Sequence, residues 1–347
     1  MPKLRLGVIG GGGIASAHLP HLRQRAVEGE IELVGIADVN SAAASTAKKY
    51  DVERFVTDYR ELLPDVDAVL ICVPTHLHAE IAVEALSEGK SVFCEKPMAR
   101  TLEQADAMCD AAQKSGAALQ IGFVRRFDDE WLAWREAVLS DQIGRPVVWR
   151  VVASGSGPGA AWFTQDQQGG GPFLDGCIHN FDFALHTFGP AQWVFCHGRT
   201  LNKANTAIDT GTATVRFQSG DELMLAWSWG LPKGHCGAYV FEFLGPHGTL
   251  TWPRAEEPEA TERCFIINRN EVDDGHVEDG QIVRFPIDSL EQGFKRQIDE
   301  FIAVAQGRKK PCAGGKESRK SLHLALAVLE SARNGQVVPL QSPGSGS

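Results

Sequence analysis

The sequence predicts a doubly wound α/β domain followed by a second domain that is built on an antiparallel sheet with flanking helices. Through the first third of the chain, short apolar runs alternate with helical patterns, and a glycine-rich turn joins the first run to the first helix. After about residue 123, strand-like runs follow one another with turns between them. Alternation of strands and helices favours a parallel sheet covered on both faces, whereas successive strands favour an antiparallel sheet.

Length and composition fit two domains with their own cores. The chain has 347 residues, 43% of them hydrophobic, and we expect domains at 1–124 and 125–341 with a flexible tail at 342–347. The formal net charge of -10 argues against nucleic acid or an anionic membrane as a partner. No long apolar run opens or interrupts the sequence, so we expect a cytoplasmic protein without signal peptide or membrane span.

The cysteines and histidines do not predict a metal site. Eight cysteines are spread singly along a chain too large to need disulfides, so reduced and mostly buried thiols are expected. The 11 histidines form no compact ligand set with carboxylates. We therefore expect no catalytic metal.

Five continuous apolar runs supply the predicted strands of the first domain. Their β-branched composition is typical of strands that are buried on both faces. Residues 78–88 carry a helical apolar stripe, and Thr101 with Gln104 three residues later predicts a capping box at the start of another helix. The predicted strands are 4–9, 31–37, 68–73, 91–94 and 118–123.

The second domain has six predicted strands, and residues 218–221 form its clearest hairpin turn. One strand alternates so that four large apolar residues share a face, namely Leu223, Leu225, Trp227 and Trp229. We expect this face to pack on the domain's own helices, whose stripes lie at 290–302 and 322–329; a subunit interface is the alternative. The strands are 147–153, 192–198, 211–217, 222–229, 239–244 and 264–268.

The glycine-rich turn is the first chemical signal. In the Gly-x-Gly-x-x-Gly register, Gly10 supplies a tight turn, Gly12 a bare backbone beside a pyrophosphate, and Ala15 close helix packing. Amides at the start of the following helix then face the phosphates. We assign Gly10, Gly12, Gly13 and Ile14 to dinucleotide binding, although a glycine run alone also suits a flexible turn.

Asp38 closes the second predicted strand, roughly 20 residues beyond the turn, where an acidic side chain binds the ribose hydroxyls. Its carboxylate would repel a 2′-phosphate, so we predict NAD as cofactor and rank NADP below it. Capping of the next helix is an alternative role that is compatible with the first. The predicted preference for NAD over NADP would be weaker if the side chain of Lys48 or Lys49 lay close enough to bind the 2′-phosphate.

Lys96 is the best single indication of the chemistry. It ends the run Ser-Val-Phe-Cys-Glu-Lys-Pro at residues 91–97, at the carboxyl end of a predicted strand. A lysine at the carboxyl end of a strand, beside a nucleotide site and shielded by a second domain, can act in proton exchange near neutral pH. A surface lysine in a turn is the simple alternative. The nucleotide fingerprint before it, with Asp175 and His179 after it, favours catalysis.

Four motifs in this order resemble those of the Gfo/Idh/MocA family of dehydrogenases. They are the glycine-rich turn, Val73-Pro-Thr-His-Leu-His78, Glu95-Lys-Pro97, and Gly169-Gly-Gly-Pro-Phe-Leu-Asp-Gly-Cys-Ile-His179. The likeness covers nearly the whole chain. It implies a Rossmann domain, a second domain on a large, mostly antiparallel sheet, and homodimers or homotetramers, which we expect to form through that sheet. It also implies oxidation or reduction of sugars, polyols and their derivatives.

The resemblance assigns the reaction to Lys96, Asp175 and His179. In this interpretation His179 takes the hydroxyl proton as hydride leaves carbon, Lys96 polarises the same oxygen, and Asp175 holds a substrate hydroxyl or orients the base. The four-residue spacing places Asp175 and His179 on one face of a helix, which Pro172 can start. Alternatively, Asp175 caps this helix and His179 packs beneath the sheet.

Further positions are assigned to the cofactor and substrate pockets. Pro74, Thr75 and His78, with Glu95 and Lys96, are predicted to contact the cofactor, whereas His76 stands where the family often has Asn. The predicted substrate contacts are Lys96, Arg126, Trp162, Asp175 and His179.

Two of these substrate contacts have a structural alternative. Trp162 also suits a core position, and Arg126 also suits a pair across the domain junction.

From the resemblance we expect a cis peptide between Lys96 and Pro97. Cys177 is close to His179 in sequence, but the two side chains diverge on one helix, so we expect no catalytic thiol.

The sequence therefore predicts an NAD-dependent oxidoreductase that acts on a CH–OH group of a sugar, inositol or related polyol. The site is expected in a cleft between the two domains. One alternative is a redox-assisted lyase or glycosidase that regenerates NAD in each turnover. Another is a non-catalytic, nucleotide-sensing protein, against which the intact set of Lys96, Asp175 and His179 argues.

Overall fold

The computed structural model describes residues 3–237, 239–252, 262–269, 272–273, 276–277 and 280–340. The chain forms two compact units. The first unit contains Met1–Phe127 and Leu290–Leu322, and the second contains Asp128–Ser289 and His323–Ser347. The first unit thus includes a segment from late in the chain, which the predicted range 1–124 does not contain. The tail predicted at 342–347 lies outside the described residues.

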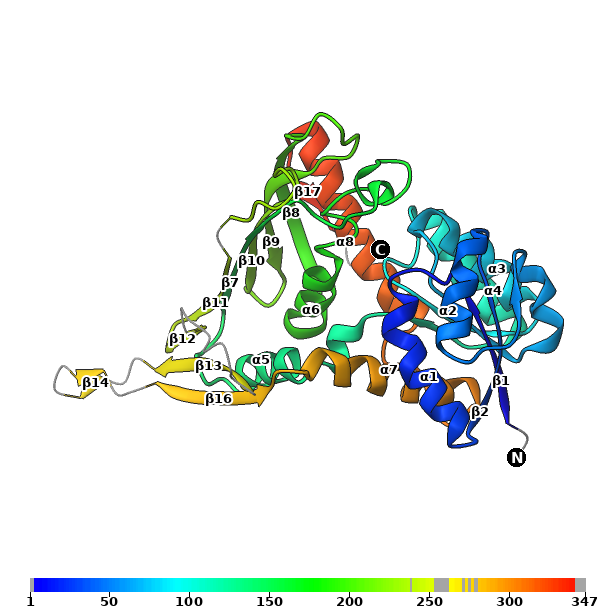
Figure 1. Cartoon of the computed structure of the whole chain (residues 1–347). Coiled ribbons are helices and arrows are strands. Elements are labelled where there is room, and N and C mark those ends of the chain that lie inside the picture. The colour runs from blue at the N-terminus through cyan, green and yellow to red at the C-terminus, as the bar shows by residue number, and fades with distance from the viewer. Residues whose placement is uncertain are drawn as a thin grey trace. The chain divides into compact units, whose positions relative to one another are not determined.

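The first unit is a six-stranded parallel sheet in the order β3-β2-β1-β4-β5-β6, which confirms the predicted doubly wound fold. Helices α1 and α7 lie on one face, and α3 and α4 lie on the other (Figure 1). The strands are β1 (Leu4–Ile9), β2 (Ile31–Ala37), β3 (Phe55–Val56), β4 (Ala68–Ile71), β5 (Ser91–Cys94) and β6 (Leu119–Ile121). The helices are α1 (Ala15–Val27), α2 (Ala44–Lys49), α3 (His78–Ser87), α4 (Leu102–Ser115) and α7 (Ser289–Ala305).

The late segment belongs to the first unit because α7 buries its apolar stripe there. Ile298, Phe301 and Ile302 are at most 1% exposed and join the core formed by α1 and the central strands. The predicted cap of α4 is also present, since the Thr101 hydroxyl accepts the Gln104 N–H at 3.2 Å. All residues of β4 and β5 are buried, as strands covered on both faces require.

The second unit contains a nine-stranded sheet in the order β16-β13-β12-β11-β7-β10-β9-β8-β17. Its pairs are antiparallel except for β7 with β10, so the predicted mostly antiparallel sheet is confirmed. Its strands are β7 (Val148–Ser154), β8 (Ala191–Arg199), β9 (Thr210–Phe217), β10 (Glu222–Ser228), β11 (Val240–Gly245), β12 (Gly248–Thr251), β13 (Glu262–Arg269), β16 (Gln281–Pro286) and β17 (Val338–Pro339). Strands β14 (Val272–Asp273) and β15 (His276–Val277) form a separate pair.

One face of this sheet is covered by the unit's own helices, α5 (Asp129–Leu139), α6 (Ile178–Phe188) and the later part of α8 (Gly315–Asn334). Trp149 on β7 packs edge-on to Phe183 of α6, with ring centroids 4.9 Å apart. Leu223 and Leu225 are fully buried, as their alternation predicts. Trp227 and Trp229 are only half-buried. Among the described residues, no helix has the length and apolar character to cross a membrane.

Candidate active site

The glycine-rich turn has the geometry that the sequence predicts for a dinucleotide-binding turn. Gly10 has φ +99°, and a Cβ at this position would lie 2.5 Å from the Cys72 carbonyl oxygen, so only glycine fits. A Cβ on Gly12 or Gly13 would meet nothing within 4 Å. The backbone of these two residues is therefore open on one side, where a ligand can approach closely.

Helix α1 begins at Ala15, directly after this turn, and Ala15 is fully buried. Ile14 occupies the N-cap without a side-chain hydrogen bond, and the first turn of the helix contains no acidic residue. The first amides of α1 are thus not capped by a side chain. Such a helix N-terminus attracts an anion, so these residues fit the pyrophosphate of a dinucleotide.

Asp38 lies at the end of β2 and faces the same turn. Its Oδ2 accepts the Gly11 N–H at 2.8 Å, and its Oδ1 accepts the Asn40 N–H at 2.8 Å. The following short helix is capped by Asn40, whose side chain accepts the Ala42 N–H at 3.1 Å. The alternative role of Asp38 as a helix cap is therefore taken by Asn40. The carboxylate instead stands at the glycine-rich turn, where a ribose would be bound.

The loop after β4 contributes Pro74, Thr75 and His78. Thr75 is 1% exposed, and its hydroxyl has no hydrogen-bond partner among the described residues. The ring of His78 lies between two main-chain carbonyl oxygens, with Nδ1 2.8 Å from that of Pro97 and Nε2 2.9 Å from that of Val73. His78 thus ties this loop to the segment that carries Lys96. The sequence motif did not reveal this bridging position.

Lys96 follows β5, and the peptide between Lys96 and Pro97 is cis, as expected. The neighbouring Glu95 is 5% exposed, and its Oε1 lies 2.7 Å from Nε2 of His18 on α1. Its Oε2 accepts the Lys96 N–H at 3.1 Å. His18 is absent from the set of residues predicted from the sequence, because an apolar helix face with one histidine gives no chemical signal by itself.

The second unit positions Asp175 and His179 after a tightly packed glycine run. Gly170 and Gly171 have φ near +77° and +79°. A Cβ on Gly169 would lie 2.5 Å from the Phe163 backbone, so the run fits only without side chains. Trp162 lies beside it: its ring stacks on that of Phe163 with centroids 3.7 Å apart, and its main-chain carbonyl oxygen accepts the Gly169 N–H at 2.8 Å.

The prediction that Asp175 and His179 share a helix starting at Pro172 is wrong. Helix α6 begins at Ile178, because the Cys177 N–H binds the Pro172 carbonyl at 2.7 Å across a wider turn than an α-helix makes. Asp175 lies in this turn and is 3% exposed, whereas His179 lies in the first turn of α6 and is half-buried.

Arg126 and Cys177 have structural surroundings that the sequence did not reveal. Arg126 donates to the Cys312 carbonyl, which ties the late segment to the first unit, and its guanidinium lies 5.9 Å from the Phe123 ring centroid. Cys177 is fully buried, and burial raises the pKa of its thiol well above the ordinary value. A thiol kept protonated is a poor nucleophile, in agreement with the expectation that Cys177 is not catalytic.

The predicted cofactor residues Gly10, Gly12, Gly13, Ile14, Asp38, Pro74, Thr75, His78, Glu95 and Lys96 all belong to the first unit, around the ends of β1, β2, β4 and β5. The second unit holds Trp162, Asp175 and His179. No group of three or more metal-ligating side chains occurs within the described part of the chain.

Comparison with known proteins matches two segments of the chain, one in each unit, to models of one family. Residues 4–123 match a family model described as the oxidoreductase family, NAD-binding Rossmann fold, and residues 131–251 match the GFO/IDH/MocA C-terminal domain. The inositol 2-dehydrogenase of Rhizobium meliloti is 35% identical, with 94% of this chain and 96% of that protein covered. The myo-inositol 2-dehydrogenase of Thermotoga maritima is 29% identical, with 97% and 99% covered.

A solved structure agrees at the level of the fold. The WlbA dehydrogenase of Bordetella pertussis, determined in complex with NADH and UDP-GlcNAcA, has a TM-score of 0.79 at 24% identity. The comparison covers 98% of this chain and 100% of that one. With its dinucleotide-binding turn, its Glu-Lys-Pro segment and matches to both family models, the chain belongs to the Gfo/Idh/MocA family of NAD-binding oxidoreductases.

Proposed function

We propose that the protein is an NAD-dependent dehydrogenase that transfers a hydride between nicotinamide and a secondary alcohol or ketone of an inositol, sugar or related polyol. The observation that carries this proposal is the intact dinucleotide half of the site. Asp38 and the open glycines stand at one end of the parallel sheet, and Lys96 follows β5 at the same end. Inositol dehydrogenases among the relatives, one of them 35% identical, support the substrate class.

The preference for NAD over NADP rests on Asp38. Both of its carboxylate oxygens already accept main-chain N–H groups, which hold the carboxylate at the turn. A 2′-phosphate placed there would meet a fixed negative charge. Ribose hydroxyls, in contrast, are donors that a carboxylate binds well. Pro74 and Thr75 are proposed to line the nicotinamide end of the same pocket.

We propose a separate role for each of the side chains Lys96, Asp175 and His179. In the oxidation, the base His179 takes the hydroxyl proton, and the Lys96 ammonium donates a hydrogen bond to the oxygen, which gains negative charge as the O–H bond breaks; hydride then leaves the carbon and the carbonyl forms. Asp175 holds a neighbouring hydroxyl or orients His179. The cofactor supplies the hydride acceptor. Trp162 and Arg126 are proposed to contact the rest of the substrate.

The test is a substrate screen. Inositols, sugars and sugar acids are incubated with NAD or NADP, and absorbance of the reduced nicotinamide is measured against time. A dehydrogenase forms one reduced nicotinamide for each alcohol oxidised. A lyase or glycosidase that regenerates NAD would consume substrate without net NADH, and a nucleotide-sensing protein would bind NAD and convert nothing.

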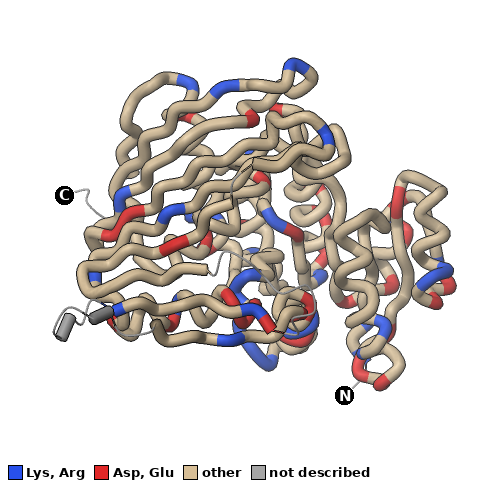
Figure 2. Tube along the Cα trace, turned by 60° about the vertical axis from the view of Figure 1, so that its left-hand side comes forward, with Lys and Arg blue, Asp and Glu red and all other residues tan. Residues whose placement is uncertain are grey.

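The outer face of the second sheet supports a homo-oligomer, and we propose that a second copy of the chain covers it. Phe195 on β8 and Met224 on β10 lie on either side of Thr214 on β9, in one cross-strand row. They are 38% and 42% exposed. Arg150 continues this row and pairs with Glu242. Basic and acidic residues are interspersed over the strands (Figure 2), so two such faces can pair without like-charge repulsion.

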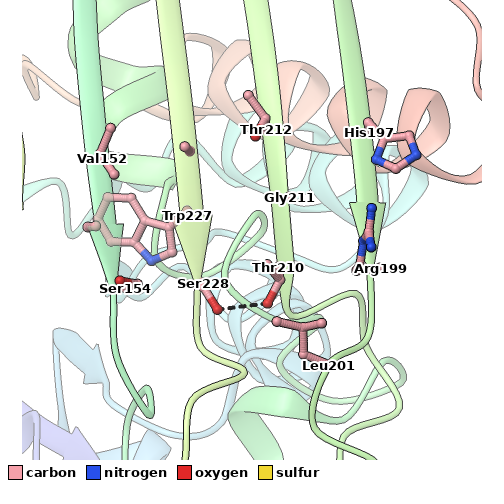
Figure 3. Close-up of a pocket in the computed structure, with 12 residues that line it drawn as sticks. Val152, Ser154, His197, Arg199, Leu201, Thr210, Gly211, Thr212, Trp227 and Ser228 are labelled. Atoms are coloured by element: carbon pink, nitrogen blue, oxygen red, sulfur yellow. Dashed lines mark hydrogen bonds between the residues drawn. The ribbon is translucent and has the colours of Figure 1, made fainter. Parts of the chain in front are cut away.

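The outer face is also hollowed at one end. A shallow cavity of about 380 Å³ lies over β7 to β10, lined by Ser154, His197, Arg199 and neighbouring residues (Figure 3). The Thr210 and Ser228 hydroxyls are 2.7 Å apart in it. In a symmetric pair, side chains of the second copy would fill this hollow.

Sedimentation of the wild type tests the homo-oligomer, with Met224→Glu as the disrupting variant. Leu132→Glu is the matched control, because Leu132 is 40% exposed but lies on α5, away from the sheet face. We expect dimers or tetramers for the wild type and the control, and monomers for Met224→Glu. A monomeric wild type contradicts the proposal.

A further inference from the structure

We propose that His18 and Glu95 form a buried pair that positions Lys96, so that His18 is a positioning residue for the reaction. The inference rests on the proposed function only in the role given to Lys96. The pair itself lies entirely within the first unit, on α1 and at the end of β5.

The contacts form a short chain that ends at Lys96. Nε2 of His18 lies 2.7 Å from Oε1 of Glu95, and the other carboxylate oxygen accepts the Lys96 N–H at 3.1 Å. The side chains of His18 and Glu95 are 0% and 6% exposed. A carboxylate so deeply buried requires partners for both oxygens, and His18 and the Lys96 amide supply them.

Packing fixes the pair from several directions. The His18 ring contacts Phe93 and Phe294 edge-on, with centroids 5.3 Å and 5.2 Å away. A Cβ on Gly122, after β6, would lie 2.9 Å from the Glu95 carboxyl carbon. The glycine therefore leaves the space that the carboxylate occupies. Since the ring and the carboxylate are both enclosed, the backbone at Lys96 is held in one place.

The position of His18 on α1 gives the pair its significance for the site. His18 lies one turn after the start of α1, the helix whose N-terminus follows the glycine-rich turn. One buried contact thus joins the element that binds the dinucleotide to the residue that acts on the substrate. Misplacement of a catalytic group by about 1 Å costs up to about 100-fold in rate, so a fixed Lys96 backbone matters for turnover.

Loss of the imidazole leaves the carboxylate buried without its partner. Such a group turns toward other donors or toward water, because an uncompensated buried charge is costly. When the Glu95 carboxylate turns away, the Lys96 N–H loses its acceptor. The alternative is that the pair only stabilises the fold, in which case its loss lowers stability and leaves Lys96 unchanged in every folded molecule.

The test uses two disrupting variants, one rescue and two controls. His18→Leu removes the donor, and Gly122→Ala displaces Glu95 without touching the imidazole. His18→Gln keeps an N–H donor near the place of Nε2. His21→Leu is the control on the same helix. Gly159→Ala is the control for added volume, because its Cβ meets nothing within 4 Å.

The first measurement reports on Lys96 without requiring turnover. Lysines are acetylated with acetic anhydride under native conditions, and peptide mass spectrometry compares Lys96 with the exposed Lys114 in each variant. We expect the Lys96 rate to change about threefold or more in His18→Leu and Gly122→Ala, and to return to the wild-type rate in His18→Gln. The Lys114 rate stays constant. An unchanged Lys96 rate in both folded variants overturns the proposal.

The second measurement separates positioning from stability. With myo-inositol and NAD, or the best compound of the screen, we expect kcat to fall about tenfold in both disrupting variants while the Kd for NADH changes less than about twofold. A lower melting temperature with unchanged kcat overturns the proposal. If the wild type converts no compound, the proposed function fails, and Lys96 acetylation still decides whether the pair positions Lys96. If His18→Leu does not fold, Gly122→Ala decides.

Discussion

The Asp38 carboxylate accepts the Gly11 amide at 2.8 Å, which ties the end of β2 to the glycine-rich turn. The same carboxylate accepts the Asn40 amide, so its position is set by the backbone before any ligand arrives. A preformed carboxylate selects its ligand by charge, because no rearrangement can move it away from a phosphate. We therefore propose that the choice between NAD and NADP depends on this one side chain.

Asp38→Ala is expected to weaken NAD by about tenfold or more, since hydrogen bonds to a charged group are lost. NADP should be weakened less, because the repulsion of its 2′-phosphate is removed at the same time. Fluorescence titration of both reduced cofactors measures the two affinities. Asp38→Asn serves as the comparison, because it keeps an acceptor oxygen without the charge. Equal weakening of the two cofactors by Asp38→Ala would contradict the assignment.

The glycines of the turn are expected to respond in opposite ways to alanine. Gly10→Ala should lower the free energy of unfolding by about 1–3 kcal/mol or more, because φ is +99° and the new Cβ would meet the Cys72 carbonyl. Gly12→Ala should leave stability within about 0.5–1 kcal/mol and weaken NADH binding, since its Cβ would enter open space beside the backbone. Urea unfolding and NADH titration of both variants check this contrast. Intact NADH binding by Gly12→Ala would exclude close approach of the pyrophosphate.

The first unit was predicted well from the sequence because its signals are local. Continuous apolar runs and the turn glycines marked β1, β2 and β5 at the bounds that the structure has. The two-residue strand β3 gave no run long enough to recognise. Membership of α7 in the first unit depends on long-range packing of Phe301 and its neighbours, which periodicity alone does not reveal.

The pH dependence of stability should report the buried thiols Cys72, Cys94 and Cys177. Burial raises the pKa of each thiol well above its ordinary value. The unfolded chain therefore releases these protons above about pH 8.5, while the folded chain keeps them, and stability falls as pH rises. Cys177→Ala should make the fall shallower by about 1.4 kcal/mol per pH unit in alkaline solution. Urea unfolding of wild type and variant at pH 8, 9 and 10 measures the difference, and identical slopes would contradict it.

The sequence predicts the residue types of the candidate site, and these stay predictions, whereas the local structure around Asp175 and His179 was predicted less well. The Glu-Lys-Pro and Gly-Gly-Gly-Pro segments are recognisable because glycine, proline and charged residues keep their identity in sequence. The start of α6 at Ile178 depends on a wide turn that closes onto Pro172, and such a turn has no composition of its own. The contact of His18 with Glu95 joins residues 77 positions apart, beyond any local pattern.

Lys96→Ala is expected to keep NADH binding within about threefold and to reduce kcat by about 100- to 1,000-fold, the usual range for loss of a donor to a developing oxyanion. Lys114→Ala, at an exposed position of α4, is the matched control and should retain full activity. Steady-state kinetics with NADH titration measures both quantities. Wild-type turnover by Lys96→Ala would remove this lysine from the mechanism.

The most direct test of the account is a double-variant cycle of Lys96→Ala and His179→Ala, measured as kcat for hydride transfer from a substrate deuterated at the carbinol carbon. Residues that serve one alcohol act as a unit, so the double variant should be hardly slower than the slower single variant. NADH binding should persist in all three variants. If the two losses in rate multiply instead, the lysine and the histidine act independently, and the proposed common site is wrong.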